Sequence, residues 1–470
     1  MLKKIVLVAV ICASGMIAQA KVELPKIFSN NMVLKQKAKA KIWGTSSSQT
    51  KVQIQTSWDK KTYTVESDQQ GKWSVAVNTP AAGGPYDITF DDGTKTSLSN
   101  ILIGEVWLCS GQSNMEMRMK GNKNQPILNG PEIIANSSNN NIRMFTVVKN
   151  ASKVPLNNCE GEWLAASPET TPEFSAVAFQ FAQMLQKKLN VPVGIISTSW
   201  GGTPIRSWMD SSFDEFSSMY PVTEKTEGRL TGKQLYNGMI APLVPYALSG
   251  FLWYQGENDR VTPERYEKMM ALMIKEWRVK FGQGDLGFYY VQIAPWKYKE
   301  TPDNYYSAFL REAQYKVAKK VKNAGLAVTS DVGSDQSIHP PNKTAVAERL
   351  YKQALVKTYK IKEGIYEGPE YKSMKVQGQK VTLNFTNTGQ GLVLNSDDQS
   401  NFEVAGADKV FHKAVAKLVG NSIEVESTSV ASPVAVRYAF KDYFVGNLFN
   451  KDGYPASSFR TDNWTVPVQK

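Results

Sequence analysis

The sequence predicts an α/β domain with a mainly parallel sheet, flanked on each side by a β region. Between residues 98 and 360, short apolar runs alternate with segments whose apolar residues recur at helical spacing, as in strands joined by helices. On either side, at 21–97 and 361–470, apolar residues recur at every second position, as they do in antiparallel sheets. A hydrophobic content of 42% and a charged content of 21% are typical of a folded protein, which excludes a disordered chain.

The first twenty residues are predicted to lie outside the fold. A basic start precedes an apolar stretch, and Ala18-Gln19-Ala20 places small residues at the cleavage positions before Lys21. This pattern is typical of a secretory signal peptide at 1–20, so we expect a secreted or periplasmic protein. The apolar stretch is too short to span a bilayer and no later segment is apolar enough, so no membrane insertion is expected.

The region 21–97 is predicted to form a small β-sandwich. Apolar residues alternate in three short segments bounded by turn residues, at Val52–Thr56, Trp73–Val77 and Ile88–Phe90. The last of these precedes Asp92-Gly93, a pair that favours a hairpin turn. Several short strands with frequent turns are typical of two packed antiparallel sheets.

The central region 98–360 begins with a buried strand and continues with alternating helices and strands. The mostly apolar runs that predict strands are Ile101–Leu108, Val193–Thr198, Phe251–Tyr254, Phe288–Ile293 and Leu326–Thr329. A first helix is expected at 172–189, with Thr171 as its N-cap and Pro172 in its first turn. Further helices are expected from Thr262, around Leu310–Val321 and around Val346–Ala354.

From residue 361 the apolar period returns to two. The alternating segments are Val381–Phe385, Ile423–Val425 and Val436–Phe440, and they predict a second β region at 361–470. The sequence leaves open whether the two β regions form one domain or two.

Charge and cysteine content narrow the classes of partner. The formal net charge is +12, but the basic residues are scattered, and the densest cluster, at 319–322, falls on a helical pattern. A solvated helix face is the simpler interpretation, so no nucleic-acid partner is predicted. The chain has two His and three Cys residues, and it contains no Cys-x-x-Cys or His-Glu-x-x-His pattern. No metal site is therefore predicted. Cys109 and Cys159 can pair in an oxidising compartment, and the sequence leaves that open.

Four residues with catalytic chemistry follow the predicted strands, where parallel α/β sheets bind their ligands. Ser113 lies among small neighbours that permit the tight turn of a nucleophile. Gly201 belongs to a glycine pair whose backbone N–H suits an oxyanion, and Asn258 offers a side-chain donor to the same oxyanion. His339 lies beside acidic residues, as a general base with an orienting carboxylate does. Each residue is common in ordinary loops; their order along successive strands indicates a catalytic site.

One further motif is rejected. The run Gly282–Gly287 matches the glycine fingerprint of dinucleotide-binding proteins. It follows a predicted helix and precedes a predicted strand, which is the reverse of the order that binds a pyrophosphate. We therefore predict a loop at this position.

These motifs resemble the SGNH hydrolase superfamily, whose four residue types occur at Ser113, Gly201, Asn258 and His339. More narrowly, almost the whole chain after residue 20 resembles the sialate O-acetylesterase family. The segments that carry this resemblance are Asn31–Leu34, Gly104–Met115, Trp253–Asn258, Ile338–Lys343, Asn447-Leu448 and Ser458–Asp462.

The resemblance implies a three-layer α/β/α domain and a serine esterase that needs no cofactor. Ser113 is then the nucleophile and His339 the base, while Gly201 and Asn258 form the oxyanion hole together with the N–H of Ser113. The flanking residues expected to bind substrate are Gln112, Gln255, Glu257 and Arg206.

The acid that orients His339 departs from the family pattern. The usual position, three residues before the histidine, is Gln336. Asp335, four residues before it, is the favoured partner. Asp331, another acid or a backbone carbonyl are the alternatives.

The resemblance also implies an O-acetylated carbohydrate as the substrate. O-Acetylated sialic acid, acetylated at O9, is expected first, and acetylated plant polysaccharides such as xylan, xyloglucan or pectin are the alternative. A competing class is a non-catalytic glycan-binding protein with a decayed hydrolase core. The presence of all four catalytic residue types favours the enzyme, whereas the oligomeric state is left open.

Overall fold

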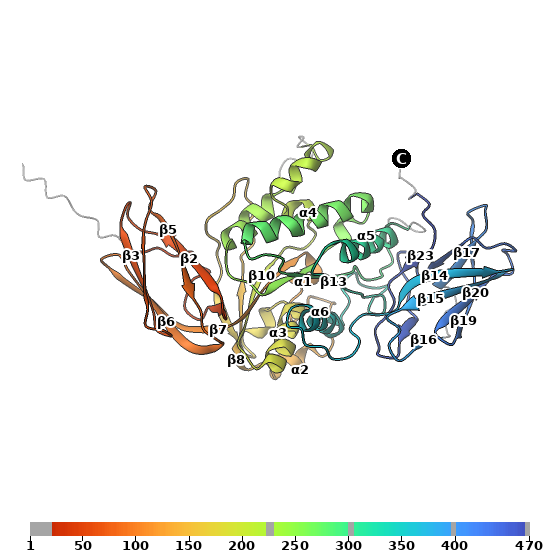
Figure 1. Ribbon diagram of the computed structural model, residues 1–470, viewed down its shortest axis with the longest axis horizontal. Helices are drawn as coiled ribbons and strands as arrows, with labels where there is room; N and C mark the ends of the chain where they lie inside the picture. The colour runs from red at the N-terminus through yellow and green to blue at the C-terminus, as the bar shows by residue number, and fades with distance from the viewer. Residues whose placement is uncertain (1–20, 222–229, 299–304, 396–400, 466–470) are drawn as a thin grey trace, which may run out of the picture.

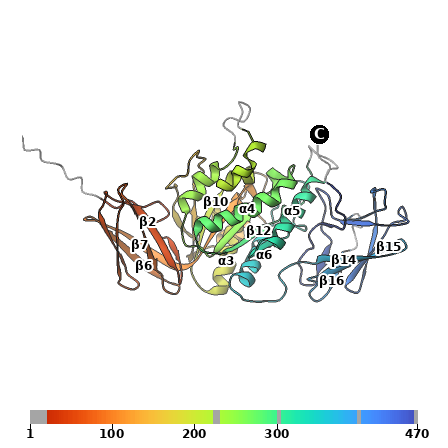
Figure 2. The ribbon, with the colours of Figure 1, turned by 45° about the horizontal axis from the view of Figure 1, so that its top comes forward.

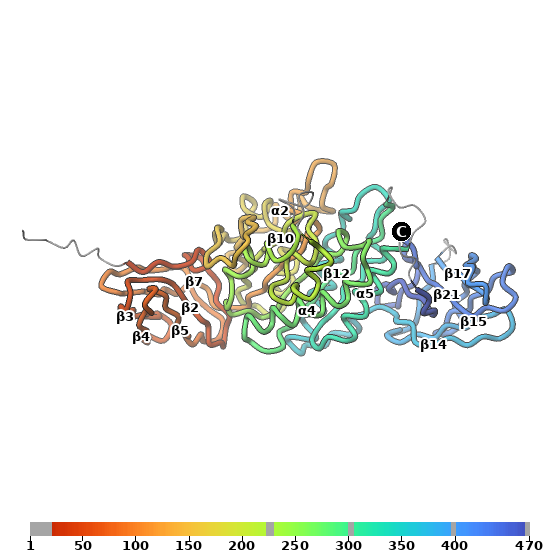
Figure 3. The backbone as a smooth tube through the Cα atoms, turned by 90° about the horizontal axis from the view of Figure 1, so that it is seen from above, coloured from red at the N-terminus to blue at the C-terminus, as the bar shows by residue number. Residues whose placement is uncertain are grey.

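The computed structural model describes residues 21–221, 230–298, 305–395 and 401–465, so the predicted signal peptide at 1–20 lies outside the described residues. Figures 1 and 3 show three regions in a row: an N-terminal β region, a central α/β region and a C-terminal β region. This α/β architecture with antiparallel sheets at both ends confirms the predicted fold class.

The central sheet is parallel except for one edge strand. Its order is β13-β12-β11-β7-β10-β8-β9, and β9 runs antiparallel to β8. The strands are β7 (Lys95–Gly111), β8 (Asn139–Thr146), β9 (Trp163–Ala166), β10 (Val193–Ser199), β11 (Gly250–Tyr254), β12 (Gly287–Val291) and β13 (Ala324–Ala327). Every residue of β10 to β13 is buried, which explains why these strands read as apolar runs.

Helices cover both faces of this sheet, as Figures 1 and 2 show. On one face α3 (Ala176–Leu189) packs against α6 (Lys343–Lys357), and on the other α4 (Pro263–Phe281) packs against α5 (Tyr306–Lys320). Successive side chains of β11 point to opposite faces of the sheet. Trp253 packs into the core on one face and Leu252 into the core on the other. No helix within the described ranges is both long and apolar enough to cross a membrane.

Shorter helical segments lie in the loops of the central region. They are α1 (Ser113–Glu116), α2 (Gly130–Ala135), η1 (Thr171–Glu173), η2 (Ile205–Trp208), η3 (Ser211–Met219), η4 (Tyr236–Ile240), η5 (Ala241–Leu243) and η6 (Glu257–Asp259).

The start of α3 corrects a prediction. The sequence suggested Thr171 as the N-cap, but Thr171 and Pro172 lie in the separate 3-10 turn η1. Phe174 is extended, so the helical conformation is interrupted, and α3 begins only at Ala176. The cap is Ser175, whose Oγ accepts a hydrogen bond from the N–H of Ala178 at 3.3 Å.

Strand β7 joins the N-terminal region to the central sheet. Its first half pairs antiparallel with β6 (Gly83–Asp91), and its second half pairs parallel with β10 and β11. The strand continues without a break through residues 97 and 98, so both regions share its backbone hydrogen bonds. The other strands of the N-terminal region are β1 (Val33–Lys35), β2 (Lys39–Thr45), β3 (Lys51–Thr56), β4 (Thr62–Glu66) and β5 (Lys72–Asn78).

The C-terminal region consists of antiparallel sheets at the opposite end of the molecule (Figure 1). Two four-stranded sheets have the orders β14-β15-β20-β19 and β18-β17-β21-β23, and β16 pairs with β22. The strands are β14 (Glu370–Gln377), β15 (Lys380–Thr386), β16 (Leu392–Leu394), β17 (Phe402–Ala405), β18 (Phe411–Lys413), β19 (Val415–Val419), β20 (Ser422–Glu426), β21 (Ala435–Tyr438), β22 (Leu448–Asn450) and β23 (Phe459–Arg460). The predicted alternation is confirmed, because Val381, Leu383, Ile423 and Val425 are buried in one core.

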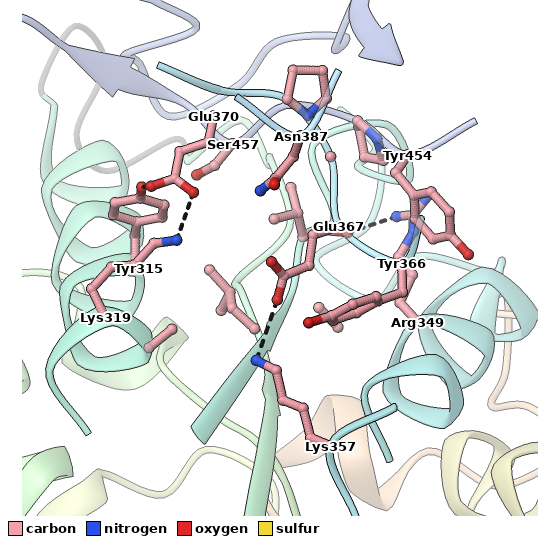
Figure 4. A pocket seen from close by; sticks show the side chains of 17 residues that line it. Tyr315, Lys319, Arg349, Lys357, Tyr366, Glu367, Glu370, Asn387, Tyr454 and Ser457 are labelled. Atoms are coloured by element: carbon pink, nitrogen blue, oxygen red, sulfur yellow. Dashed lines mark hydrogen bonds and ion pairs between the residues drawn. The ribbon is translucent and has the colours of Figure 1, made fainter. Parts of the chain in front are cut away.

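A pocket of about 180 Å³ lies at the seam between the central and C-terminal regions (Figure 4). Ion pairs cross the seam: Lys319 of α5 lies 2.6 Å from Glu370, and Lys357 of α6 lies 3.2 Å from Glu367. Each pair is partly exposed and contributes little stability alone. Their effect is to hold the C-terminal region against α5 and α6.

The two cysteines of the described residues do not pair. Cys109 lies in β7 and Cys159 in the loop before β9, and both are buried with free thiols. Burial raises the pKa of both thiols, to about 12 for Cys159, so both stay protonated at neutral pH.

Candidate active site

The sheet order brings three of the predicted site residues to one place. β7 lies between β10 and β11. After β7 the chain first forms β8 to β10 on one side of it, and then β11 to β13 on the other side. Such a switch point leaves a crevice at the carboxyl ends of the strands. Ser113 follows β7, Gly201 follows β10 and Asn258 follows β11.

A tight turn presents Ser113 at the end of β7. Gly111 has φ +141°, and a Cβ there would lie 2.1 Å from the carbonyl oxygen of Tyr254, so the turn requires glycine. The N–H of Gln112 donates to that same carbonyl at 2.9 Å, which fixes the turn to β11. Ser113 is then the first residue of α1, and it is only half-buried.

The structure brings Ser113 and His339 together although 226 residues separate them. His339 Nε2 lies 2.8 Å from Ser113 Oγ. On the other side of the ring, His339 Nδ1 lies 2.9 Å from the amide oxygen of Gln125. Because that oxygen is an acceptor, Nδ1 carries the proton and Nε2 is free to accept the proton of the Ser113 hydroxyl. This is the geometry of a nucleophile and its general base.

The residue that orients His339 differs from the prediction. Asp335 is exposed, and the hydrogen-bond partner of His339 Nδ1 is Gln125. Asp331 is used elsewhere: its two oxygens each lie 2.7 Å from the guanidinium of Arg349. The partner of the ring is therefore an amide and not a carboxylate.

Burial and a neighbouring charge keep His339 neutral. Desolvation lowers its pKa, the positive charge of Lys343 lowers it further, and the negative charge of Glu116 opposes both. The resulting pKa is about 4, so the imidazole is in its basic form throughout the neutral range.

The predicted oxyanion donors lie beside Ser113 but are engaged with protein groups. A Cβ on Gly201 would lie 3.2 Å from Ser113 Cβ, which shows how close the two segments are. The N–H of Gly201 donates to Glu116 Oε2 at 2.6 Å. Asn258 is exposed, and its Nδ2 donates to the carbonyl oxygen of Gly202 at 2.8 Å. The carboxylate of Glu116 therefore occupies the Gly201 donor in this structure.

Glu116 is itself held by a cation at the rim of the site. Its Oε1 forms an ion pair with Lys149, and the Lys149 ammonium lies 5.6 Å from the centroid of the Trp200 ring. Trp200 is only partly buried, whereas Trp107, Trp208 and Trp253 are fully buried in the cores. Of the four tryptophans near the motifs, only Trp200 is accessible for contact with a sugar ring.

Three of the residues expected to bind substrate are buried and hydrogen-bonded to protein groups. Gln112, Gln255 and Glu257 are buried, with exposed fractions of 3%, 0% and 7%. Gln112 Oε1 accepts the N–H groups of Gly256 and Asn258 at 3.4 Å, and so supports the turn that carries Asn258.

The other two have equally specific protein partners. Gln255 Nε2 donates to the carbonyl of Thr203 at 3.1 Å, and Glu257 Oε1 accepts from Asn114 Nδ2 at 2.6 Å. The fourth expected residue, Arg206, is partly buried, and its guanidinium stacks on Tyr220 at 4.6 Å.

The structure shows no candidate metal cage, because within the described ranges no three His, Cys, Asp or Glu side chains converge. The run Gly282–Gly287 connects α4 to β12, so it follows a helix and precedes a strand, as the sequence predicted. The chemistry that the site supports is acyl transfer: a hydroxyl hydrogen-bonded to a neutral base, with N–H donors close by.

Comparisons with known proteins agree on one family. A family model described as "Carbohydrate esterase, sialic acid-specific acetylesterase" matches residues 103–356, which include Ser113, Gly201, Asn258 and His339. A solved structure of a carbohydrate acetylesterase from Xanthomonas citri is 34% identical, with a TM-score of 0.86, and covers 94% of this chain and 100% of that one. Sialate O-acetylesterase from Homo sapiens is 27% identical over 458 residues, which is 88% of this chain and 86% of that protein. The Mus musculus protein of the same name is 28% identical over 442 residues, 80% of each chain.

Proposed function

Because this chain belongs to the sialic acid-specific acetylesterase family of carbohydrate esterases, we propose that Ser113 and His339 carry out its reaction, the removal of O-acetyl groups from a carbohydrate. One observation carries the assignment: the 2.8 Å contact between Ser113 Oγ and the unprotonated Nε2 of His339. No other His lies in a strand-end loop of the central sheet, since His412 belongs to β18.

The proposed mechanism has two steps. His339 Nε2 takes the proton of Ser113 while Oγ attacks the acetyl carbonyl, and the imidazolium then protonates the departing sugar oxygen. Water, deprotonated by the same nitrogen, attacks the acetyl-serine, and acetate leaves as Ser113 recovers its proton.

The oxyanion requires three donors, and two of them form hydrogen bonds with protein groups in the resting site. The N–H of Ser113 lies in the first turn of α1, where a helix leaves its N–H groups without intrahelical acceptors. The N–H of Gly201 becomes available once the substrate displaces the Glu116 carboxylate, and Asn258 Nδ2 has a second hydrogen to donate. One such donor lowers the barrier by roughly 3–4 kcal/mol.

The proposed substrate is an O-acetylated sialic acid, with the acetyl group at O9 as the first candidate. Support comes from the description of the matching family and from the name that the mammalian relatives share. Acetylated plant polysaccharides are the second candidate. The X. citri protein, which is 34% identical, is described as a carbohydrate acetylesterase with no sugar named, a description that fits either candidate. The non-catalytic alternative is set aside, because the chain is a carboxylic ester hydrolase by family.

Release of acetate from a panel of acetylated glycans tests the substrate. Purified protein is incubated with 9-O-acetylated sialic acid, acetylated xylan, acetylated xyloglucan and acetylated pectin at matched acetyl concentrations. The proposal predicts the highest kcat/KM on the sialic acid. A preference for one of the polysaccharides would transfer the assignment to the second candidate, and no acetate from any ester would contradict the function.

The proposed location is outside the cytoplasm, in the medium or the periplasm. Its support is the basic start, the apolar stretch and the Ala18-Gln19-Ala20 sequence. N-terminal sequencing of protein from the source cells should find Lys21 first, and an intact N-terminus at residue 1 would contradict the proposal.

A further inference from the structure

A buried polar network lies beneath the nucleophile. Lys343 and Asn114 are fully buried and Glu257 is 7% exposed. The Lys343 ammonium donates a hydrogen bond to Asn114 Oδ1. Asn114 Nδ2 donates to Glu257 Oε1 at 2.6 Å and to the carbonyl oxygen of Ile338 at 3.1 Å. Asn114 is therefore the centre of a network that uses both ends of its amide.

This network joins the segments that carry the site residues. Asn114 follows Ser113, Ile338 precedes His339 and Glu257 precedes Asn258. Lys343 is the first residue of α6, the helix that follows the His339 loop. Partners separated by 143, 224 and 229 residues in sequence thus meet at one side chain. A shift of this side chain would move the nucleophile and the base relative to each other.

The charges in the network depend on one another. Burial lowers the pKa of Lys343 to about 7, and the negative charge of Glu257 opposes that shift. Burial also raises the pKa of Glu257, while Asn114 and Lys343 lower it. Glu257 Oε2 has no hydrogen-bond partner, so the positive charge of Lys343 helps to stabilise the negative charge of this carboxylate. Breaking such a buried pair on one side costs more than removing both charges.

We propose that Lys343 is a positioning residue, which acts through Asn114 to hold Ser113 and the His339 loop at the distance that proton transfer requires. The inference rests on the proposed function of the same site. Lys343 does not touch the reacting atoms, and a displacement of about 1 Å in such a constellation lowers turnover roughly a hundredfold.

A lysine that acted through packing alone, without its charge, would leave the titration of His339 unchanged, so this titration provides a separate readout. The charged groups that face this imidazole are Lys343 from α6 and Glu116 from α1, and Glu116 is in turn paired with Lys149. The ring's other partner, Gln125, is neutral. Loss of the Lys343 charge removes the positive group that opposes protonation, so the pKa of His339 rises from about 4 toward its ordinary value of 6.5.

The test is Lys343→Met, which keeps an unbranched side chain up to the ε position and removes the ammonium group with its charge. With p-nitrophenyl acetate, kcat should fall about tenfold to a hundredfold while KM changes less than about threefold. The acid limb of kcat/KM, followed from pH 3 to pH 8, should move upward by roughly one pH unit. The matched control is Lys352→Met on the same helix, where Lys352 pairs with Glu363 at the surface. This control should keep the wild-type kcat and pH profile.

A second variant covers the case in which Lys343→Met fails to fold. Lys343→Met combined with Glu257→Gln removes both charges and leaves neither uncompensated. This double variant should fold and show the same upward shift of the acid limb, because Glu257 is not among the groups that shift the pKa of His339.

Two results would overturn the inference. The first is a folded Lys343→Met or double variant with wild-type kcat. The second is a folded variant with reduced kcat but an unmoved acid limb, which would assign Lys343 a structural role alone. Either result leaves the proposed function intact as long as the wild type cleaves the ester. Failure of the wild type itself to release acetate would instead contradict the proposed function.

Discussion

At the scale of single residues, the pH dependence of the reaction follows from the surroundings of His339. The base must be unprotonated to accept the Ser113 proton. A solvated imidazole titrates near pH 6.5, which would predict a loss of activity below neutral pH. Burial and Lys343 lower the pKa of His339 to about 4, so the base form persists in mildly acidic solution.

We therefore predict that kcat/KM for p-nitrophenyl acetate is nearly constant from pH 5.5 to pH 7.5 and falls with a single-proton limb near pH 4. His339→Ala should abolish activity, whereas His412→Ala in β18 should leave both activity and profile unchanged. A midpoint near pH 6.5 in the wild type would show that the imidazole is solvated during turnover.

The amide partner of His339 leads to a second prediction. Gln125 Oε1 lies 2.9 Å from His339 Nδ1, while Asp335 is exposed. Gln125→Ala should lower kcat about tenfold to a hundredfold, because the ring loses the contact that fixes its tautomer. Gln125→Glu should move the acid limb of kcat/KM upward, since a carboxylate favours the imidazolium.

Asp335→Asn is the matched comparison, with an expected change in kcat below about twofold. If kcat fell by several orders of magnitude in Asp335→Asn and did not change in Gln125→Ala, the carboxylate of Asp335 would be the group that orients His339.

Glu116 supplies a third prediction at this scale. Its carboxylate accepts the hydrogen bond of the Gly201 N–H. This hydrogen bond must break before the oxyanion can use that donor. Glu116→Ala removes the competitor, and kcat/KM for p-nitrophenyl acetate should rise about threefold to tenfold. Acetate, which mimics the carboxylate, should then inhibit the variant more strongly than the wild type. A fall in kcat/KM would mean that Glu116 supports the Gly201 turn instead of blocking it.

At the scale of elements, Ser175 links the nucleophile segment to α3. Its Oγ caps α3 at Ala178 N and donates to the carbonyl oxygen of Met115 in α1 at 2.6 Å. Ser175→Ala should lower the free energy of unfolding by about 1–2 kcal/mol, because the N–H of Ala178 and the carbonyl oxygen of Met115 each lose their hydrogen-bond partner. Urea denaturation measures this difference, with the exposed Ser97→Ala in β7 as the control. A difference below about 0.3 kcal/mol would show that water replaces the hydroxyl.

The same element shows where reading of the sequence succeeds and where it fails. The interior of α3 was predicted from apolar spacing because one face of the helix packs against the sheet. The start of α3 was not predicted correctly, because Thr171 and Ser175 are both suitable N-caps. Phe174 between them is extended, so the helix begins after it and Ser175 is the cap. The buried strands of the sheet were predicted for the same reason as the helix interior, since their length and apolarity follow from burial on both faces.

The site was predictable to the extent that it follows the strand ends. Ser113, Gly201, Asn258 and His339 were predicted as site residues because a parallel sheet brings the carboxyl ends of its strands together. Gln125 carries no such signal, since it lies in an irregular segment and meets His339 across 214 residues.

The direction of a side chain is equally invisible in the sequence. Gln112 and Glu257 flank the motifs, but the turn at Gly256, with φ +155°, directs Asn258 outward and leaves Glu257 buried.

At the scale of the whole molecule, the flanking β regions are connected to the central sheet in different ways. The N-terminal region shares the continuous strand β7, which ends at the nucleophile turn. The C-terminal region instead meets α5 and α6 across the seam of Figure 4, through ion pairs such as Lys319 with Glu370. All four residues of the proposed mechanism belong to the central region, between these two attachments in the chain.

Ser113 is the proposed nucleophile, and the activity of a variant without its hydroxyl decides whether it acts as one. Turnover of p-nitrophenyl acetate is compared between the wild type, Ser113→Ala and Ser97→Ala; Ser97 is an exposed serine in β7, the strand that precedes Ser113. All three proteins should show the same unfolding transition. The account predicts that Ser113→Ala loses at least about a thousandfold in kcat while Ser97→Ala loses nothing. A folded Ser113→Ala that retains most of its turnover would contradict it.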